Sequence, residues 1–292
     1  MSARRGPKRL DRDRLDSVQE ANREWWEQTP MTYNWSSGFS HRPNTIPWFD
    51  EQDRLSVLAH AHFATQNRPF DQLLRYDELA GKRVLEIGVG SGFHAELLAH
   101  AGAQVTGIDL TAASIECTRE RFALKGLQGT FEQWDAEKPR PEFLKQFSFI
   151  WSWGVIHHSS MTARIVRNIA SWLEPGGAFG GMVYHRDSTT LAIALARQWI
   201  LKGKIGSYSV DEALWRNTDG FSARFYPADQ WRDLLLAFFQ HAEVGVTGID
   251  TDLPIPKSLR PLVLPRLTAA SKNRYLERFG SFVTFRATSP LD

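Results

Sequence analysis

Short apolar runs alternate with longer amphipathic segments through the centre of the chain. The periodic segments predict helices at 93–101, 111–126 and 162–173, the first ending at Gly102 and the second capped by Thr111. A β-rich run lies before or after each of them: KRVLEIG, AQVTGIDL, GTFEQWD, FSFIWSW and AFGGMVYH. This alternation predicts a doubly wound α/β fold with a mostly parallel sheet. FSFIWSW is apolar on both faces, as a central parallel strand is.

The flanking regions follow other patterns. Helical patterns cover 17–28, about 51–78, 188–202 and 227–239. The sequence at 203–226 predicts a loop or lid, and residues 174–177, between the central helix and strand, predict a turn. EVGVTGID and SFVTFRAT predict an antiparallel strand pair, separated by a proline-rich insertion at 253–266. We expect 1–50 to form a tail and an aromatic lid segment. Residues 51–292 then form one α/β domain with insertions near 188–226 and 251–275.

Composition narrows the class of protein. The chain has 292 residues, of which 42% are hydrophobic and 23% are charged, with a net charge of +2. It has no run of about 20 apolar residues and no secretory signal, so we expect a cytoplasmic protein with no membrane partner. The single Cys117 excludes an internal disulfide framework and a multi-cysteine zinc site, and no metal is expected. Beyond the basic run at 4–14 there is no basic stripe, so a nucleic-acid partner is disfavoured.

A glycine-rich turn follows the first predicted strand. Gly88, Gly90 and Gly92 lie between this strand and a helix, where glycine lets the backbone approach a ligand closely. The next strand ends at Asp109, which suits the two ribose hydroxyls of an adenosine. A dinucleotide site would place glycine at position 93, where this chain has phenylalanine. Glu86 would repel a pyrophosphate but would attract an ammonium group, which favours S-adenosylmethionine (SAM) over NAD.

A family resemblance adds to this interpretation. VLEIGVGSG, GIDLT, the acid in WDA, WGVIHHS and LEPGG resemble, in order and spacing, the motifs of bacterial class I SAM-dependent methyltransferases. The similarity covers roughly residues 80–186 and is greatest to the quinone-biosynthesis group. The resemblance implies a seven-stranded Rossmann-like methyltransferase fold and SAM as cofactor. It also implies a set of cofactor contacts: Glu86, Gly88, Gly90 and Gly92 at the methionine end, Asp109 at the ribose, Leu110, Asp135 and Ala136 at the adenine, and Ser152 and Trp153 facing the sulfonium.

Histidines are the candidate catalytic bases. Methyl transfer needs alignment of the reactants, and removal of a proton where the acceptor carries one. His157 and His158 follow the fourth strand, and His185 follows the fifth, at the carboxyl edge where ligands of such folds bind. A purely structural role of each histidine is the alternative at this point.

The aromatic N-terminal segment is a candidate lid. Tyr33 and Trp35 are expected to touch the cofactor or the acceptor, while core packing explains the same rings equally well. The sequence therefore predicts methyl transfer to oxygen or nitrogen of a small metabolite, with carbon as a third option. A catalytically silent SAM-binding partner protein and an NAD-binding oxidoreductase remain the alternatives. The acceptor and the oligomeric state are not readable from the sequence.

Overall fold

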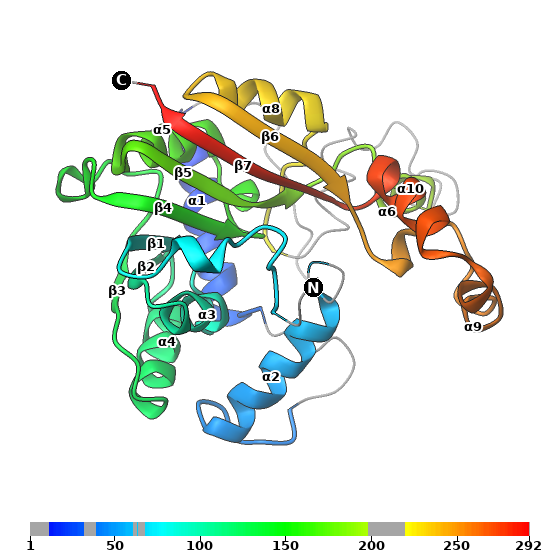
Figure 1. Ribbon diagram of the computed structural model, residues 1–292, viewed down its shortest axis with the longest axis horizontal. Coiled ribbons are helices and arrows are strands. Elements are labelled where there is room, and N and C mark those ends of the chain that lie inside the picture. The colour runs from blue at the N-terminus through cyan, green and yellow to red at the C-terminus, as the bar shows by residue number, and fades with distance from the viewer. Residues whose placement is uncertain (1–11, 32–38, 61–62, 64–67, 198–219, 292) are drawn as a thin grey trace.

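A single sheet forms the centre of the protein. The computed structural model describes residues 12–31, 39–60, 63, 68–197 and 220–291. Within this part of the chain, seven strands pair in the order β3-β2-β1-β4-β5-β7-β6 (Figure 1). They are β1 (Arg83–Ile87), β2 (Gln104–Asp109), β3 (Thr130–Gln133), β4 (Phe147–Trp153), β5 (Leu173–Tyr184), β6 (Phe239–Thr247) and β7 (Phe282–Pro290).

The strand directions confirm the predicted architecture. The first five strands pair in parallel, and β7 lies antiparallel between β5 and β6. β4 lies between β1 and β5, and every residue of it except Ser148 is buried, as its two apolar faces predict. The predicted turn at 174–177 lies within β5. There Phe147 pairs with Leu173 while Phe149 pairs with Ala178, so the strand accommodates the extra residues as an irregularity.

Helices cover both faces of the sheet. One face packs against α3 (Phe93–His100) and α4 (Ala112–Leu124), together with Phe63 and apolar side chains of segment 70–79. The other face packs against α5 (Thr162–Trp172) and α8 (Ala228–Leu236). Both faces are thus removed from water, which is the condition for a parallel sheet.

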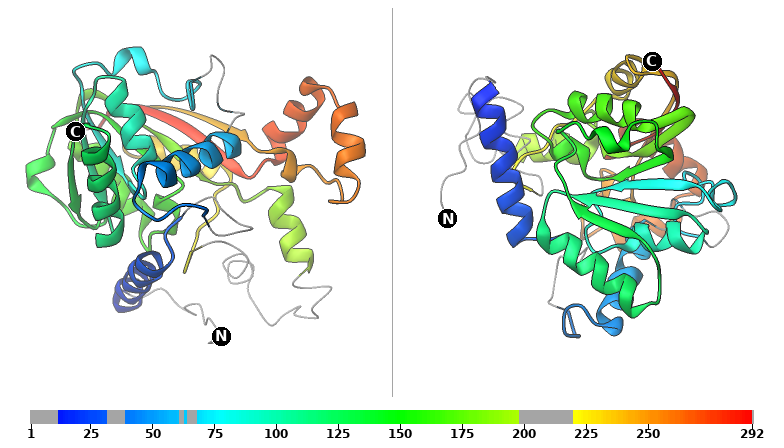
Figure 2. Two further views of the ribbon diagram at one scale, coloured as in Figure 1. Left: turned by 90° about the horizontal axis from the view of Figure 1, so that it is seen from below. Right: turned by 90° about the vertical axis from the view of Figure 1, so that its left-hand side faces the viewer.

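The region before the sheet differs from prediction. The helix at 17–28 is confirmed as part of the longer α1 (Arg12–Gln28), but a single helix over 51–78 is wrong. Instead, α2 (Ile46–Ala59) ends early, and a short 3₁₀ turn occupies 76–78. Phe70 has a φ of 61°, a left-handed conformation that no α-helix contains. Figure 2 shows α1 and α2 as separate helices beside the sheet.

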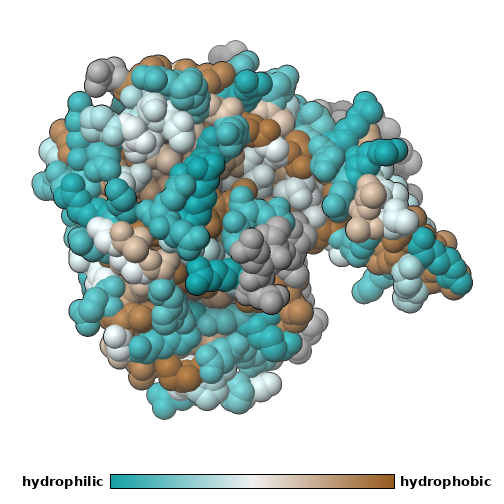
Figure 3. Space-filling model, viewed as in Figure 1, coloured by the Kyte–Doolittle hydropathy of each residue, from teal (hydrophilic) through white to brown (hydrophobic). Residues whose placement is uncertain are grey.

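The region after β5 carries a projecting arm. α6 (Thr189–Ala196) lies in the predicted helix at 188–202, of which 198–202 fall in the stretch 198–219 outside the described residues. Between β6 and β7 the insertion holds α9 (Arg260–Val263) and α10 (Ala269–Phe279), of which the helix α10 was not predicted. This arm extends away from the rounded body of the molecule (Figures 1 and 3). Short 3₁₀ turns also occupy Pro141–Phe143, Ile156–His158, Asp250–Asp252 and Leu264–Arg266.

Candidate active site

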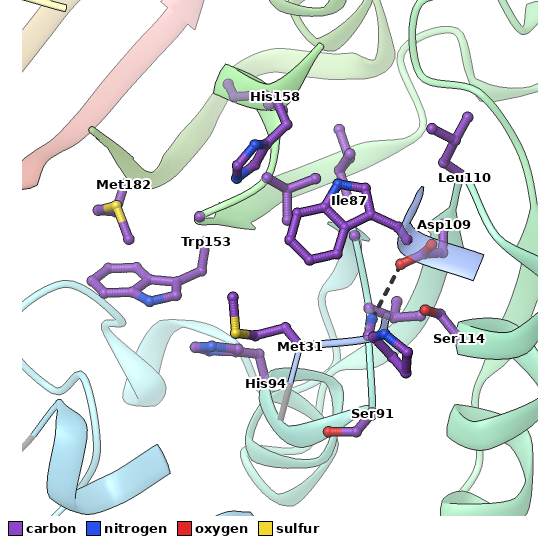
Figure 4. A pocket seen from close by; sticks show the side chains of 18 of the residues that line it. Met31, Ile87, Ser91, His94, Asp109, Leu110, Ser114, Trp153, His158 and Met182 are labelled. Carbon is purple, nitrogen blue, oxygen red and sulfur yellow. Dashed lines mark hydrogen bonds between the residues drawn. The ribbon is translucent and has the colours of Figure 1, made fainter. Parts of the chain in front are cut away.

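A cavity of about 340 Å³ lies at the carboxyl edge of the parallel strands. The turns that follow β1, β2, β3 and β4 form one side of it, and α1 and α2 form the other. A volume of this size falls within the range of about 300–1,000 Å³ that small-ligand sites occupy. Figure 4 shows side chains around it from the ends of β2 and β4 and the turns after them, among them Asp109, Trp153 and His158, together with Met31, which follows α1.

The glycine-rich turn has the backbone conformation that its sequence predicts. Gly88, Gly90 and Gly92 have φ values of 82°, 54° and 81°, a region that side chains with a Cβ rarely adopt. Gly88 and Gly90 line the cavity, whereas Gly92 begins α3 and packs against α4. A Cβ on Gly88 would lie 2.3 Å from a methyl group of Val155, while a Cβ on Gly90 would meet nothing within 4 Å. The turn therefore brings bare backbone to the cavity wall at Gly90.

Glu86 is a buried carboxyl group behind this turn. It is 1% exposed, and its Oε2 has no hydrogen-bond partner in the described part of the chain. Burial, together with the nearby Asp109 carboxylate, raises its pKa well above the usual range, and Arg121 and the Ala95 amide act in the opposite direction. It does not line the cavity directly. An unpartnered carboxyl oxygen at this depth suits a cationic ligand group.

Asp109 faces the cavity from the end of β2. Its Oδ2 accepts a hydrogen bond from the Gly90 amide (3.2 Å), and its Oδ1 accepts from the amide (2.9 Å) and hydroxyl (2.8 Å) of Thr111. Partial burial raises the pKa of Asp109, although these three hydrogen bonds act in the opposite direction. They fix the carboxylate against the glycine-rich turn (Figure 4).

The residues predicted beside an adenine gather around the next two turns. Leu110, Asp135 and Ala136 all line the cavity. The Asp135 Oδ1 accepts from the Glu137 amide and from the Gln19 side chain of α1, each at 3.0 Å. Helix α1 therefore reaches the turn after β3.

An aromatic cluster forms the cavity wall at the end of β4. Trp153 lines the cavity and donates through its Nε1 to the Nε2 of His60 at 3.2 Å. Its ring stacks on Trp151, with centroids 5.5 Å apart. Ser152 points to the other side, where its hydroxyl donates to the Ile87 carbonyl, and it does not line the cavity. Of the two residues predicted at this tip, only the tryptophan reaches the cavity.

The three candidate histidines occupy different environments. His158 lines the cavity, and its Nδ1 lies 2.6 Å from the Ser222 carbonyl, so the neutral ring holds its proton there and its lone pair on Nε2. His157 is fully buried away from the cavity against Tyr184, and burial lowers its pKa well below the usual range. His185 is also buried away from the cavity, with its Nδ1 at 2.7 Å from the Gly280 carbonyl. The structure brings only His158 to the cavity.

Helix α1 contributes residues that the motifs did not indicate. Gln19, Asn22 and Trp26 line the cavity. The Asn22 side chain donates to the His158 carbonyl (2.7 Å) and accepts from the Ser222 hydroxyl (2.9 Å). The ring of Trp26 meets His158 edge to face at 5.2 Å. The aromatic content of the N-terminal segment was the only sequence signal for this contact. Tyr33 and Trp35, also predicted there, lie outside the described residues.

Comparison with known proteins now decides the family. Residues 84–177 match the family model described as a methyltransferase domain. The ubiquinone biosynthesis O-methyltransferase of Stutzerimonas stutzeri is 31% identical over 182 residues, which cover 62% of this chain and 73% of that protein. The enzyme of the same name from Aromatoleum aromaticum is 31% identical, over 52% of this chain and 70% of its own length. The chain belongs to the class I SAM-dependent methyltransferases.

A solved structure places this methyltransferase in the same fold class. Phosphoethanolamine N-methyltransferase 2 of Haemonchus contortus superposes with a TM-score of 0.54 at 19% identity, covering 92% of this chain and 61% of that chain. That protein was solved with phosphomonomethylethanolamine and S-adenosylhomocysteine. At this level of identity the likeness concerns the fold alone.

SAM is the cofactor of this methyltransferase, and the cavity fits it. The open space over Gly90 admits a ligand against the backbone, and the orphaned carboxyl oxygen of Glu86 lies buried behind the same turn. No helix in the described part of the chain has the length and apolar character needed to cross a bilayer.

Proposed function

We propose that this methyltransferase moves a methyl group from SAM to an oxygen of a small-molecule acceptor, with nitrogen and then carbon as the alternatives. The cavity supports this proposal because it runs without interruption from the glycine-rich turn to His158 and Trp153. On this proposal the cofactor occupies the glycine-rich end, and the acceptor group occupies the end at His158 and Trp153. The two relatives are named as O-methyltransferases, which favours oxygen.

The proposed cofactor contacts follow the cavity wall. Gly88 and Gly90 would lie against the methionine part, and Asp109 would accept from the ribose hydroxyls. Leu110, Asp135 and Ala136 would surround the adenine. Glu86 and Gly92 would act from behind the turn, and Ser152 would support the tip of β4.

The proposed chemistry assigns one task to each side of the cavity. SAM supplies an electrophilic methyl group on a sulfonium that is already a good leaving group. Trp153 presents an aromatic wall to that cation. His158 takes the proton from the acceptor through Nε2, since Nδ1 is committed to the Ser222 carbonyl. Helix α1 shields the reacting groups from water through Asn22 and Trp26.

A methyl-transfer screen tests the proposal. Purified protein is incubated with isotopically labelled SAM and fractionated small-molecule extract, and labelled products and S-adenosylhomocysteine are followed by mass spectrometry. We expect one labelled product, and none with the Asp109→Ala variant. Release no greater than that of the variant, despite measured SAM binding, would favour the alternative of a catalytically silent SAM-binding protein.

A further inference from the structure

Three polar side chains form a stripe along α2. Gln52, Ser56 and His60 are spaced four residues apart, so they lie on one face of the helix. All three line the cavity, and all three are buried, with 4%, 2% and 5% of their surface exposed. A polar stripe on a buried helix face requires hydrogen-bond partners.

Two members of the stripe lack such partners within the described part of the chain. The Nε2 of Gln52 and the Oγ of Ser56 are buried and make no hydrogen bond. Leaving each unpaired costs about 1–3 kcal/mol. His60 differs, because its Nδ1 donates to the Ser56 carbonyl (2.8 Å) and its Nε2 accepts from Trp153 (3.2 Å). The helix thus holds two unpaired polar groups in residues that line the cavity.

A third donor belongs to His94 of α3. Its Nδ1 accepts a hydrogen bond from the Nε1 of Trp151 at 3.2 Å, so the neutral ring carries its proton on Nε2. Burial lowers the pKa of His94 well below the usual range, with His60 and Arg121 acting in the same direction. The side chain lines the cavity between Ser91 and Trp153 (Figure 4).

The three donors lie at the glycine-rich end of the cavity. Asp53 is the sequence neighbour of Gln52. The Arg121 guanidinium donates to the Asp53 carboxylate (2.6 Å) and also to the Ser91 carbonyl (3.3 Å). Arg121 therefore ties α2 to the glycine-rich turn. A ligand group at this end meets donors on α2 and α3.

We propose that Gln52, Ser56 and His94 bind the carboxylate of the amino-acid part of SAM, on the proposed placement of the methionine end beside Gly88 and Gly90. A carboxylate offers about four lone-pair positions and so satisfies several donors at once. Glu86 lies behind the same turn and suits the ammonium group of the same amino acid. The stripe is thereby a recognition element that distinguishes SAM from nucleosides lacking the amino-acid part.

Calorimetric titration with two ligands tests this assignment. S-adenosylhomocysteine carries the carboxylate, and 5′-methylthioadenosine lacks the whole amino-acid part. Gln52→Leu and Ser56→Ala are each expected to weaken S-adenosylhomocysteine binding about tenfold, the loss of one hydrogen bond to a charged group. Both variants should bind 5′-methylthioadenosine like the wild type. Leu58→Ala, at a position 63% exposed on the same helix, is the matched control and should change neither affinity.

The outcomes separate this inference from the proposed function. Equal losses for both ligands, or unchanged S-adenosylhomocysteine binding, would overturn the inference; a raised acceptor KM with unchanged binding would assign the stripe to the acceptor. Wild-type protein that binds neither ligand would instead contradict the proposed function. Melting temperatures show whether each variant folds. If Gln52→Leu does not fold, Ser56→Ala, which removes only one oxygen atom, decides between the outcomes.

Discussion

The two sides of the cavity are built by different means. On the sheet side, the turns after β1, β2, β3 and β4 supply backbone and side chains, among them Gly88, Gly90 and Asp109. On the helix side, α1 and α2 supply long side chains from segments that precede the sheet. The first side depends on backbone conformation, and the second depends on tertiary packing.

This difference determines what each side can recognise. Glycines with positive φ and an acid at a strand end place a nucleoside in nearly the same way in any chain that has them. Side chains such as Asn22 and Gln52 can change without disturbing the sheet. We therefore expect substitutions in the turns after β1 and β2 to remove cofactor binding, and substitution of His158 after β4 to lower turnover. Substitutions on the helix side should adjust affinity, turnover or stability.

The largest effect is expected at Gly88. A Cβ there combines a φ of 82° with a contact of 2.3 Å to Val155, so Gly88→Ala must displace the turn. We expect a loss of S-adenosylhomocysteine binding of at least about 100-fold, since misplacing a binding backbone by about 1 Å has effects of that order. Gly126→Ala is the matched control, because Gly126 has a φ of 65° and no neighbour within 4 Å of a new Cβ. The control should lose about 1–2 kcal/mol of stability and keep its affinity; equal affinities in the two variants would contradict this account.

The second effect concerns the ion cluster that joins the two sides. Arg121 is fully buried and pairs with Asp53 of α2 (2.5 Å) and Glu96 of α3 (2.5 Å). Arg121→Met leaves two carboxylates without this partner, and we expect a loss of about 3–5 kcal/mol in urea unfolding. A loss below about 1 kcal/mol would show that the cluster does not hold α2 in place.

The same cluster predicts a pH dependence. Burial acts to raise the pKa of Glu96, but Arg121 and Lys125 outweigh it, so its pKa in the folded protein is lowered. Its contribution to stability is therefore present above its unfolded pKa of 4.5 and is lost as the pH falls through the lower folded value. In urea unfolding measured at a series of pH values below 4.5, the free energy of unfolding should fall more steeply with pH in the wild type than in Arg121→Met.

The third effect concerns the proposed base. His158→Gln is expected to lower kcat about 100-fold or more, the contribution of a positioned general base. S-adenosylhomocysteine affinity should stay within about twofold of wild type, because the cofactor contacts lie elsewhere in the cavity. His185→Gln is the comparison variant, since that ring is bonded to the Gly280 carbonyl away from the cavity. A kcat equally low in both variants would remove His158 from its assigned role.

The smallest effect is expected at Glu27. Its carboxylate accepts from the amides of Ala112 (3.1 Å) and Ala113 (3.0 Å) at the start of α4, so it acts as a cap supplied by α1. Glu27→Ala should cost about 1 kcal/mol of stability, as the loss of a helix cap does. Turnover at saturating cofactor should be unchanged. A larger change in turnover than in stability would show that α1 takes part in the chemistry.

The sequence predicted the sheet side well for a physical reason. Strand composition, the glycine-rich turn and Asp109 are local signals, and parallel topology brings them to one edge. The last two strands also formed the predicted antiparallel pair. On the helix side, the aromatic content of the N-terminal segment indicated the contact made by α1. Gln52 and Ser56 of α2 carry no such signal, because they resemble the solvent-facing positions of any amphipathic helix. The long helix expected over 51–78 is wrong: α2 ends at Ala59, and Phe70 further along adopts a left-handed conformation that the sequence does not indicate.

The division of the cavity into a cofactor end and an acceptor end is tested most directly by the affinity of two variants for S-adenosylhomocysteine. Asp109→Ala removes the proposed ribose contact, and His158→Ala removes the proposed base. Calorimetry is expected to show binding weakened about 30-fold or more in Asp109→Ala, the loss of charged hydrogen bonds, and within about twofold of wild type in His158→Ala. Equal affinities in Asp109→Ala and wild type, or a larger loss in His158→Ala, would contradict the account.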